Sequence, residues 1–194
     1  MILGILKEQN FNRVSVTPPA TKKLEAMGLT AVIEFGAGEK AGYPDQSYAA
    51  GNISAISRAD LLKEADIVVS IEPISEQEMA QLKKDSLYIS LLAPYQDAEV
   101  INKVAKYPVN VVSMDMIPRT TLAQSMDILS SMASLAGYKA VLKASDHYNN
   151  MFPMMMTAAG TIAPARVMIL GAGVAGLQAI ATARKLGAIV EVFD

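Results

Sequence analysis

The sequence predicts an α/β protein made of a parallel-sheet domain, a long connecting helix and the beginning of a second α/β domain. Three observations predict this class. Short β-rich runs alternate with helical runs over residues 1–118, which is typical of a parallel sheet covered by helices on both faces. A long helical stretch follows over residues 119–150. A glycine fingerprint between an apolar run and a helix then marks residues 151–194 as the start of an incomplete Rossmann domain.

The composition indicates a well-cored, folded chain and excludes several classes of function. Of the 194 residues, 52% are hydrophobic and 19% are charged, which suits one or two globular domains. A net charge of −2 argues against a nucleic-acid surface. The chain has no cysteine and a single histidine, His147, so it offers no disulfide, no cysteine nucleophile and no histidine-based metal site. We therefore expect neither a metal ion nor a nucleic-acid partner.

No membrane span is expected. The N-terminus lacks the basic segment and the long apolar run of a signal peptide. The longest apolar stretch, Val167–Ala183, is interrupted by three glycines and Gln178, and the glycine fingerprint explains it better than a membrane helix does. We expect a chain without direct membrane insertion.

The first domain is expected to contain five strands and five helical segments. Helix starts are marked by Thr17 before two prolines, by Ser57, and by a capping box in which Glu78 follows Ser75 by three residues. The expected strands are Ile2–Leu6, Ala31–Phe35, Asp66–Ile71, Leu87–Leu92 and Asn110–Met114, and the expected helices are Pro18–Met27, Asp45–Ala50, Ser57–Ala65, a segment opened by Ser75, and Asp97–Lys106.

The connecting helix is expected to run from Thr121 to about Tyr148. At about 1.5 Å per residue it would span roughly 40 Å, and Gly137 is a point at which it could bend. Asp127 is the only charged side chain in its first 18 residues, whereas solvated helix faces are normally rich in charge.

The two faces of this helix are expected to differ. A neutral, hydrogen-bonding arc lies opposite an apolar arc that we assign to the core. The polar arc suits a cofactor, a partner or another domain, although a solvated face is the ordinary alternative. The polar arc comprises Gln124, Asp127, Ser131, Ser134 and Tyr138 with Ser130 on its flank, and the apolar arc comprises Ile128, Leu129, Met132, Leu135 and Ala136.

A methionine-rich segment, Phe152–Met156, follows the helix. Three consecutive methionines are compatible with an adaptable apolar surface. A buried turn beneath the second domain is the interpretation that we favour.

A strand-like apolar run then leads into Gly171, Gly173 and Gly176, in the strand, G-x-G-x-x-G and helix order of a dinucleotide-binding fingerprint. Gly171 allows the tight turn, Gly173 lets a pyrophosphate approach the main chain, and Gly176 lets the helix pack closely. The helix N-terminus, which includes Val174 and Ala175, offers unpaired N–H groups to the phosphates. A glycine-rich turn that only packs is the alternative.

Asp194 ends the next apolar run, Ile189–Phe193, and follows Gly176 by 18 residues, near the usual spacing of about 20. A carboxylate there can accept hydrogen bonds from both hydroxyls of an adenosine ribose and would repel a 2′-phosphate. The fingerprint therefore predicts NAD(H) rather than NADP(H). From Arg166 onward the chain has 29 residues, whereas a dinucleotide domain needs two βαβαβ halves, so we expect a fragment truncated inside its nucleotide domain.

Three segments, residues 119–141, 152–160 and 171–183, carry a family resemblance. Together they resemble the NAD(H)-binding component, domain I, of proton-translocating nicotinamide nucleotide transhydrogenase, within the alanine dehydrogenase/transhydrogenase N-terminal family. The resemblance runs through the whole chain. Its N-terminal part, Lys7–Pro18, is shared more widely with alanine dehydrogenases.

The resemblance implies that NAD(H) binds here and exchanges hydride directly with NADP(H) bound by a partner subunit or domain, while a membrane component couples the transfer to proton movement. It implies that Arg119 and Asp127 shape the nicotinamide pocket, that Ser130 holds the carboxamide, and that Gln124 faces the NADP(H) side. It also implies a homodimer in the cytoplasm, peripheral to the inner membrane through its partners. The expected catalytic residues are Arg119, Gln124 and Asp127, and the expected cofactor-binding residues are Arg119, Gln124, Asp127, Ser130, Gly171, Gly173, Val174, Ala175, Gly176 and Asp194.

Two alternatives remain open. An alanine dehydrogenase needs an acid/base group and a cationic clamp for the substrate. Those enzymes place a lysine in the strand that here reads Val68–Pro73 and a histidine where Leu92 stands, and neither is present, while Arg13 matches both classes. Hydride transfer between two nicotinamides needs only alignment and exclusion of water, which favours the transhydrogenase. The second alternative is a non-catalytic interaction module, and the truncated chain alone is expected to be inactive.

Overall fold

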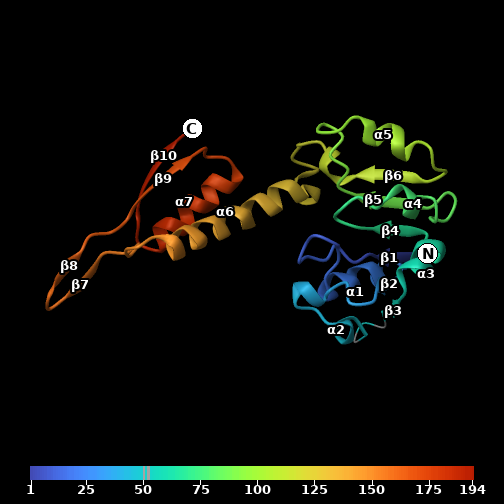
Figure 1. The fold of residues 1–194 in the computed structure, drawn as a ribbon, viewed down its shortest axis with the longest axis horizontal. Helices are drawn as coiled ribbons and strands as arrows, with labels where there is room; N and C mark the ends of the chain where they lie inside the picture. The colour runs from blue at the N-terminus through green and yellow to red at the C-terminus, as the bar shows by residue number, and fades with distance from the viewer. Residues whose placement is uncertain (50, 52) are drawn as a thin grey trace. The chain divides into compact units, whose positions relative to one another are not determined.

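The computed structural model describes residues 1–49, 51 and 53–194. The described chain forms two compact units, Met1–Pro118 and Arg119–Asp194 (Figure 1). Both units combine parallel strands with helices, so the predicted α/β fold class is confirmed.

The first unit is built on a six-stranded parallel sheet with the strand order β3-β2-β1-β4-β5-β6. The order reverses between β1 and β4, and open α/β sheets bind ligands in the crevice at the carboxyl ends of the strands at such a point. The strands are β1 Ile2–Ile5, β2 Thr30–Glu34, β3 Ser54–Ile56, β4 Ile67–Val69, β5 Leu87–Ser90 and β6 Asn110–Ser113.

Strand β3 is missing from the sequence prediction, which placed only five strands here. It has three residues and pairs with β2 at the edge of the sheet. So short a strand cannot show the alternation that identifies a strand in a sequence. The other five strands lie where they were expected; four have shorter bounds, and β2 is shifted by one residue toward the N-terminus.

Helices α1, α3 and α4 begin at the predicted start signals, α2 begins at Asp45 as expected, and α5 begins at Glu99, two residues after the expected Asp97. The Ser57 side chain accepts a hydrogen bond from a backbone N–H in the first turn of α3. At α4, Ser75 and Glu78 form both hydrogen bonds of a capping box. Thr17 occupies the N-cap position of α1 without a capping hydrogen bond, so the prolines of its first turn define that start. The helices are α1 Pro18–Ala26, α2 Asp45–Ala49, α3 Arg58–Glu64, α4 Glu76–Met79 and α5 Glu99–Val104, and Ala50, the last residue expected for the second helix, lies outside the described residues.

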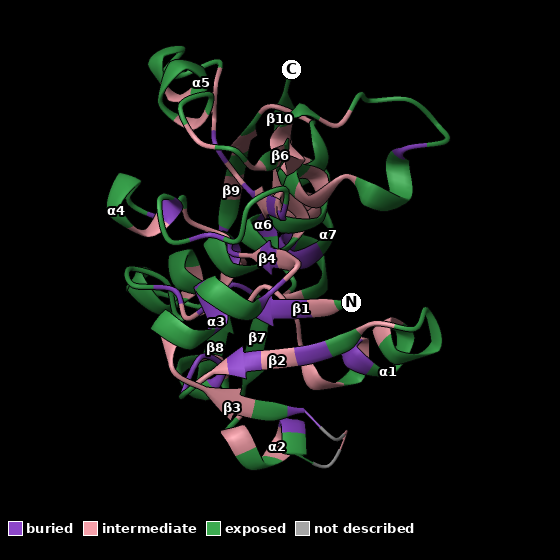
Figure 2. Ribbon diagram, turned by 90° about the vertical axis from the view of Figure 1, so that its right-hand side faces the viewer, coloured by how far each residue is buried: buried purple, intermediate pink, exposed green. Residues whose placement is uncertain are grey.

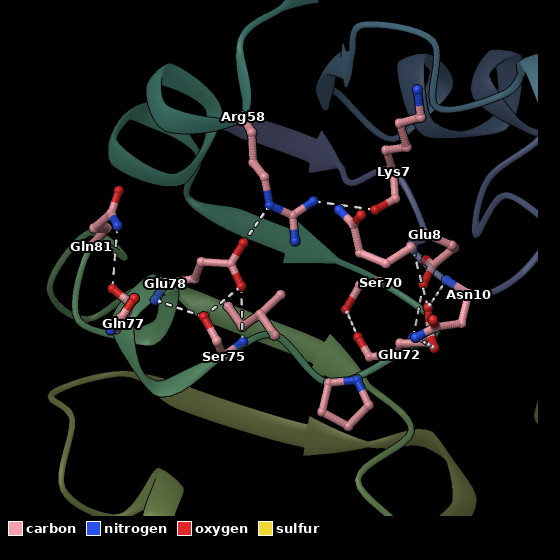
Figure 3. A pocket seen from close by; sticks show the side chains of 13 residues that line it. Lys7, Glu8, Asn10, Arg58, Ser70, Glu72, Ser75, Gln77, Glu78 and Gln81 are labelled. Carbon is pink, nitrogen blue, oxygen red and sulfur yellow. Dashed lines mark hydrogen bonds and ion pairs between the residues drawn. The ribbon is translucent and has the colours of Figure 1, made fainter.

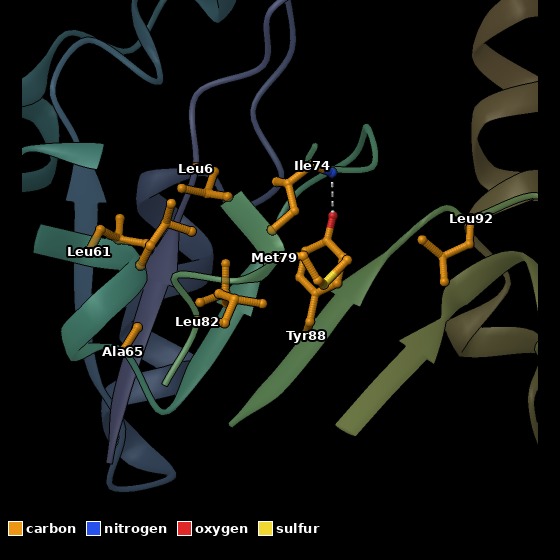
Figure 4. Close-up of a cluster of buried hydrophobic side chains, with 10 residues drawn as sticks. Leu6, Leu61, Ala65, Ile74, Met79, Leu82, Tyr88 and Leu92 are labelled. Carbon is orange, nitrogen blue, oxygen red and sulfur yellow. Dashed lines mark hydrogen bonds between the residues drawn. The ribbon is translucent and has the colours of Figure 1, made fainter. Parts of the chain in front are cut away.

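Alternate side chains of the central strands pack into two buried clusters, one on each face of the sheet. Figure 2 shows buried residues along the central strands β1, β2 and β4. In β4, Val68 belongs to one cluster, while Ile67 and Val69 pack against the other. This explains why the central strands read as continuous apolar runs. The first cluster contains Leu6, Leu61, Leu62, Ala65, Val68, Ile74, Met79, Leu82, Tyr88 and Leu92 (Figure 4), and the second contains Leu3, Ile5, Ala31, Ile33, Ala37, Tyr48 and Ile53.

Replacing Tyr88 with phenylalanine is expected to destabilise the first unit. The fully buried Tyr88 hydroxyl accepts a hydrogen bond from the Ile74 N–H at 2.9 Å and lies 2.8 Å from Ser70 Oγ. The variant leaves a buried N–H unpaired, so the free energy of unfolding should fall by about 1–3 kcal/mol. Chemical denaturation measures this, with Tyr107→Phe as the matched control, because the Tyr107 hydroxyl meets Glu76 at the surface. Equal stability of the two variants would argue against the buried network.

The second unit contains a long helix, a hairpin and one strand–helix–strand element. The strands β9 and β10 are parallel along their full length, and α7 packs on them over a small core that includes Phe152, Ala165 and Ala183. The elements are α6 Ile128–His147, the antiparallel strands β7 Met155–Thr157 and β8 Gly160–Ile162, and then β9 Arg166–Leu170, α7 Val174–Lys185 and β10 Ile189–Phe193.

The predicted start of the connecting helix is wrong, because α6 begins at Ile128 and not at Thr121. Asp127 is its N-cap, and the carboxylate accepts hydrogen bonds from the Ser130 N–H at 2.9 Å and the Ser130 hydroxyl at 2.7 Å. A capping aspartate takes a non-helical conformation, and the residues before it form the short 3-10 turn Gln124–Met126. The expected polar arc from Gln124 through Asp127 therefore does not exist as one helical face.

The assignment of the faces of α6 is also wrong. Leu129, Met132 and Leu135, expected in the core, are exposed, whereas Gly137 and Val141 are buried. The small residues of α6 pack against α7. A charged side chain at such an interface would have to be buried, and the α6 residues that meet α7 include Gly137 and Ser134, which carry no charge.

The methionine segment was expected to form a buried turn, and this is wrong. Met154, Met155 and Met156 are exposed, and the hairpin of β7 and β8 projects from the rest of its unit (Figure 1). An isolated pair of strands leaves both of its faces open, so it cannot bury the methionines within the described chain.

Candidate functional site

The glycine fingerprint lies where β9 passes into α7, as predicted. Gly171 has a φ of +95°, which side chains other than glycine rarely adopt. Its N–H donates a hydrogen bond to the Phe193 carbonyl oxygen at 2.7 Å. The turn therefore begins at the point where the pairing of β9 with β10 ends.

The other two glycines differ in what surrounds them. A Cβ at Gly173 would meet no atom within 4 Å, so this position faces open space through which a ligand can reach the main chain. A Cβ at Gly176 would lie 1.8 Å from the Gly171 carbonyl oxygen. Gly176 is thus required by the turn itself, and Gly173 is free for recognition.

The N-terminus of α7 is suited to an anion. Gly173 is the N-cap, and the first turn contains Val174, Ala175 and Gly176. No acidic side chain occupies the first turn of this 12-residue helix, all of which is described. No side chain of the first turn therefore competes for its backbone N–H groups, which together with the positive end of the helix dipole favour binding of a phosphate.

Asp194 lies beside the same turn. It follows the last residue of β10, and its Oδ1 accepts a hydrogen bond from the Ala172 N–H at 3.1 Å. Ala172 is the middle residue of the Gly171–Gly173 segment. The exposed carboxylate is thus held next to the Gly171–Gly173 segment, which is the part of the fingerprint expected to approach a pyrophosphate.

A second group of predicted residues lies at the N-terminus of α6. Hydrogen bonds from the Ser130 N–H and hydroxyl, together with the nearby charge of Arg119, hold the pKa of Asp127 below its ordinary value. Asp127 therefore stays ionised at neutral pH. Gln124 is exposed in the preceding 3-10 turn, and His147 is exposed at the opposite end of α6.

The site residues therefore form two groups within the second unit. One surrounds the turn between β9 and α7, and the other surrounds the cap of α6; Gln124 lies next to the second group without sharing its helix. The first group comprises Gly171, Gly173, Val174, Ala175, Gly176 and Asp194, and the second comprises Arg119, Asp127 and Ser130.

The sequence reasoning missed a polar cavity of about 510 Å³ in the first unit, next to the reversal of strand order (Figure 3). Two carboxylates bind the loop amides there. The Ile71 and Glu72 N–H groups donate to Glu8 at 2.6 and 2.9 Å, and the Gln9 and Asn10 N–H groups donate to Glu72 at 3.1 and 2.9 Å. Burial raises the pKa of Glu8, and the two amide hydrogen bonds offset this only in part.

Arg58 extends this network on the other side of the cavity. Its guanidinium donates to Glu78 at 2.5 Å, to Glu34 at 2.8 Å and to the Lys7 carbonyl oxygen at 3.2 Å. Arg58 is thus paired with Glu34 and Glu78, while Glu8 and Glu72 bind loop amides, and we assign these groups a stabilising role. The signal that was available in the sequence is the position of Lys7 and Glu8 directly after the first predicted strand.

The described residues contain no group of three or more His, Asp or Glu side chains arranged to hold a metal ion. None of the described helices has the length and apolar character needed to cross a membrane.

Comparison with protein families matches nearly the whole chain. Residues 4–136 match the family model described as alanine dehydrogenase/PNT, N-terminal domain. Residues 140–194 match the model described as alanine dehydrogenase/PNT, C-terminal domain. The first match ends and the second begins inside α6.

Individual relatives point in the same direction. The NAD(P) transhydrogenase subunit alpha of Cereibacter sphaeroides is 45% identical over 183 residues, which are 94% of this chain and 35% of that protein. The solved transhydrogenase structure from Sinorhizobium meliloti is 43% identical, with a TM-score of 0.95, over 100% of this chain and 59% of that one. A solved L-alanine dehydrogenase is 26% identical, with a TM-score of 0.84, over 100% of this chain and 55% of that one. The chain spans between 35% and 53% of the length of the curated transhydrogenase relatives that it matches.

Proposed function

Because the chain belongs to the alanine dehydrogenase/PNT family, we propose that it is the NAD(H)-binding component of a proton-translocating nicotinamide nucleotide transhydrogenase. In this proposal, hydride passes directly between NAD(H) held by this chain and NADP(H) held by a partner subunit or domain. The identity to transhydrogenase alpha subunits, 36% to 45%, exceeds the identity to alanine dehydrogenases, 23% to 26%.

The observation that carries the proposal is the geometry of the turn between β9 and α7. Gly173 leaves its main chain open on one side, Gly176 closes the turn, and the start of α7 offers N–H groups without a competing acidic side chain. These features favour the binding of a pyrophosphate at the turn. Asp194 is held next to the turn by its hydrogen bond with Ala172, where its carboxylate would bind the adenosine ribose.

The residues around the N-cap of α6 would bind the nicotinamide half of NAD(H). Bound NAD(H) would supply the hydride acceptor or donor, and the side chains here would bind and orient the ring. Ser130 would hold the carboxamide while Asp127 keeps the Ser130 side chain in place through their 2.7 Å hydrogen bond. Arg119 would shape the pocket beside Asp127, and Gln124 would face the NADP(H) side.

The proposed hydride transfer requires no acid or base from this chain. Hydride exchange between two nicotinamides requires alignment of the rings and exclusion of water. Asp127, whose pKa is lowered by its hydrogen bonds from Ser130, would act as a fixed charge and not as an acid. This supports the transhydrogenase assignment over an amino-acid dehydrogenase, which needs acid/base catalysis.

Replacing Asp194 with asparagine is expected to weaken NADH binding and to reduce discrimination against NADPH. The amide keeps an oxygen that can accept from Ala172, but it removes the charge that binds the ribose hydroxyls and repels a 2′-phosphate. Loss of one charged hydrogen bond should lower NADH affinity by about tenfold or more. Fluorescence titration with NADH and NADPH measures both changes.

The matched control is Glu191→Gln, which changes a neighbouring acid in β10. Glu191 pairs with Arg166 of β9 and lies outside the proposed site. Its replacement should leave both affinities unchanged. If the Asp194→Asn variant keeps the nucleotide preference of the wild-type chain, Asp194 is not part of the binding site.

Activity is tested by mixing the chain with the NADP(H)-binding component of a transhydrogenase and following hydride transfer between NADH and an NADP⁺ analogue. Transfer that depends on both components supports the proposal. Reduction of NAD⁺ by L-alanine without any partner would instead support an alanine dehydrogenase. Binding to the partner without NADH binding would support an interaction module.

The same proposal includes the partners and the location of the chain. We infer association with NADP(H)-binding and membrane components of a transhydrogenase, which would hold the chain at the cytoplasmic side of the inner membrane. A homodimer is part of the proposal, and sedimentation velocity of the chain tests it.

A further inference from the structure

Gly137 lies at the closest approach of the two helices of the second unit. It is buried, and a Cβ at this position would lie 2.1 Å from the Ala175 carbonyl oxygen and 2.9 Å from the Ala175 carbonyl carbon. Both of these are main-chain atoms of α7, which cannot rotate away as a side chain can. The main chains of α6 and α7 thus touch here, and only glycine permits the contact.

The contact falls on the dinucleotide turn itself. Ala175 is in the first turn of α7, between Gly173, the N-cap of that helix, and Gly176, which packs on the Gly171 carbonyl oxygen. A displacement of α6 at Gly137 therefore changes the position of α6 relative to the atoms that would surround a pyrophosphate.

From this contact α6 continues toward the second group of site residues. Asp127 precedes Gly137 by ten residues, which is about 15 Å along a helix at about 1.5 Å per residue. Figure 1 shows α7 beside the C-terminal part of α6, so the first turns of α6 extend beyond the start of α7. A dinucleotide anchored by its pyrophosphate at the turn has its adenosine on the Asp194 side and can extend its other half along these turns of α6.

One further contact joins the two helices near this point, and hydrogen bonds within α7 hold its partner in place. Ser134 Oγ lies 3.5 Å from Gln178 Oε1, one turn from Gly137 on α6. Gln178 donates to Thr182 Oγ1 at 3.3 Å, and the Thr182 hydroxyl donates back to the Gln178 carbonyl oxygen at 2.7 Å. Thr182 is buried, so this polar chain is held inside the interface.

We infer that Gly137 is a positioning residue, which sets the distance between the pyrophosphate-binding turn and the nicotinamide-side residues Asp127 and Ser130. This role rests on the proposed NAD(H) function. It differs from a purely structural role in one respect: it affects a ligand that spans both groups more strongly than a ligand that reaches only the turn. ADP, which carries the adenosine and the pyrophosphate alone, is such a short ligand.

The test compares calorimetric titrations of the chain with ADP and with NADH for Gly137→Ala and the wild type. A methyl group must push α6 away from Ala175, and a shift on the order of 1 Å is enough to disrupt a preorganised site. NADH affinity should fall by roughly tenfold or more, while ADP affinity should change by less than about twofold. Ala136→Leu, which adds bulk at the neighbouring exposed position, is the matched control and should leave both affinities unchanged.

Ser134→Ala provides a second variant that creates no clash, and it decides the case if Gly137→Ala does not fold. It removes the contact with Gln178 and should lower NADH affinity by a few-fold without changing ADP affinity. Equal losses for both ligands, or no loss for either, would overturn the positioning role while leaving NAD(H) binding intact. A wild-type chain that binds neither ligand would contradict the proposed function itself, and the positioning role with it.

Discussion

Replacing Gly176 with alanine is expected to abolish NAD(H) binding and to destabilise the second unit. The new Cβ would lie 1.8 Å from the Gly171 carbonyl oxygen, and that oxygen belongs to a turn whose first residue already has a φ of +95°. Forcing an atom into this space should lower the free energy of unfolding by about 3 kcal/mol. Chemical denaturation and NADH titration measure the two effects.

Gly173→Ala is the control that separates binding from folding. Its Cβ would meet nothing within 4 Å, and its φ of −65° is ordinary, so the variant should unfold like the wild type. The methyl group nevertheless projects into the open space proposed for the pyrophosphate, and NADH affinity should fall. A Gly176→Ala variant with wild-type stability, or a Gly173→Ala variant with wild-type affinity, would contradict these separate roles.

Replacing Arg58 with methionine is expected to destabilise the first unit. The variant leaves the Glu34 and Glu78 carboxylates, with side chains 12% and 25% exposed, without their common cation. Because these groups retain some access to water, the cost should be about 2–3 kcal/mol, near the lower limit for a broken buried pair. Thermal or chemical unfolding measures it. Lys83→Met, which removes an exposed pair with Asp66, should have little effect.

The Arg58 network also predicts how stability depends on pH. Burial alone would raise the pKa of Glu78, but hydrogen bonds from Arg58 and Ser75 outweigh it and hold the pKa below its ordinary value of 4.5. A carboxylate with a lowered pKa contributes stability above pH 4.5, and that contribution is lost as the pH falls through the folded-state pKa. In Arg58→Met this acid-dependent loss should be smaller. An unchanged acid dependence would show that another carboxylate is responsible.

The features that the sequence predicted well depend on local chemistry. The capping box of Ser75 and Glu78 needs only residues three apart, and it is present. The positions of Gly171 and Gly176 follow from the local geometry of one turn, and the structure gives each a steric reason. Local rules of this kind do not require knowledge of what packs against the segment.

The features that it predicted poorly depend on distant partners. Gly137 was taken as a possible bend, but its role comes from Ala175, which lies 38 residues later in the chain. The apolar side chains of α6 were placed in the core because a helical wheel does not reveal which face meets α7. The capping hydrogen bonds of Asp127, which make the helix start at Ile128 and not at Thr121, are local and could have been recognised.

The central claim is that the turn between β9 and α7 binds NAD(H), and isothermal titration of the chain with NADH and NADPH tests it most directly. We expect saturable binding of one NADH per chain, with NADPH weaker by about tenfold or more because Asp194 repels the 2′-phosphate. Absence of NADH binding, or equal affinity for NADH and NADPH, would contradict the claim.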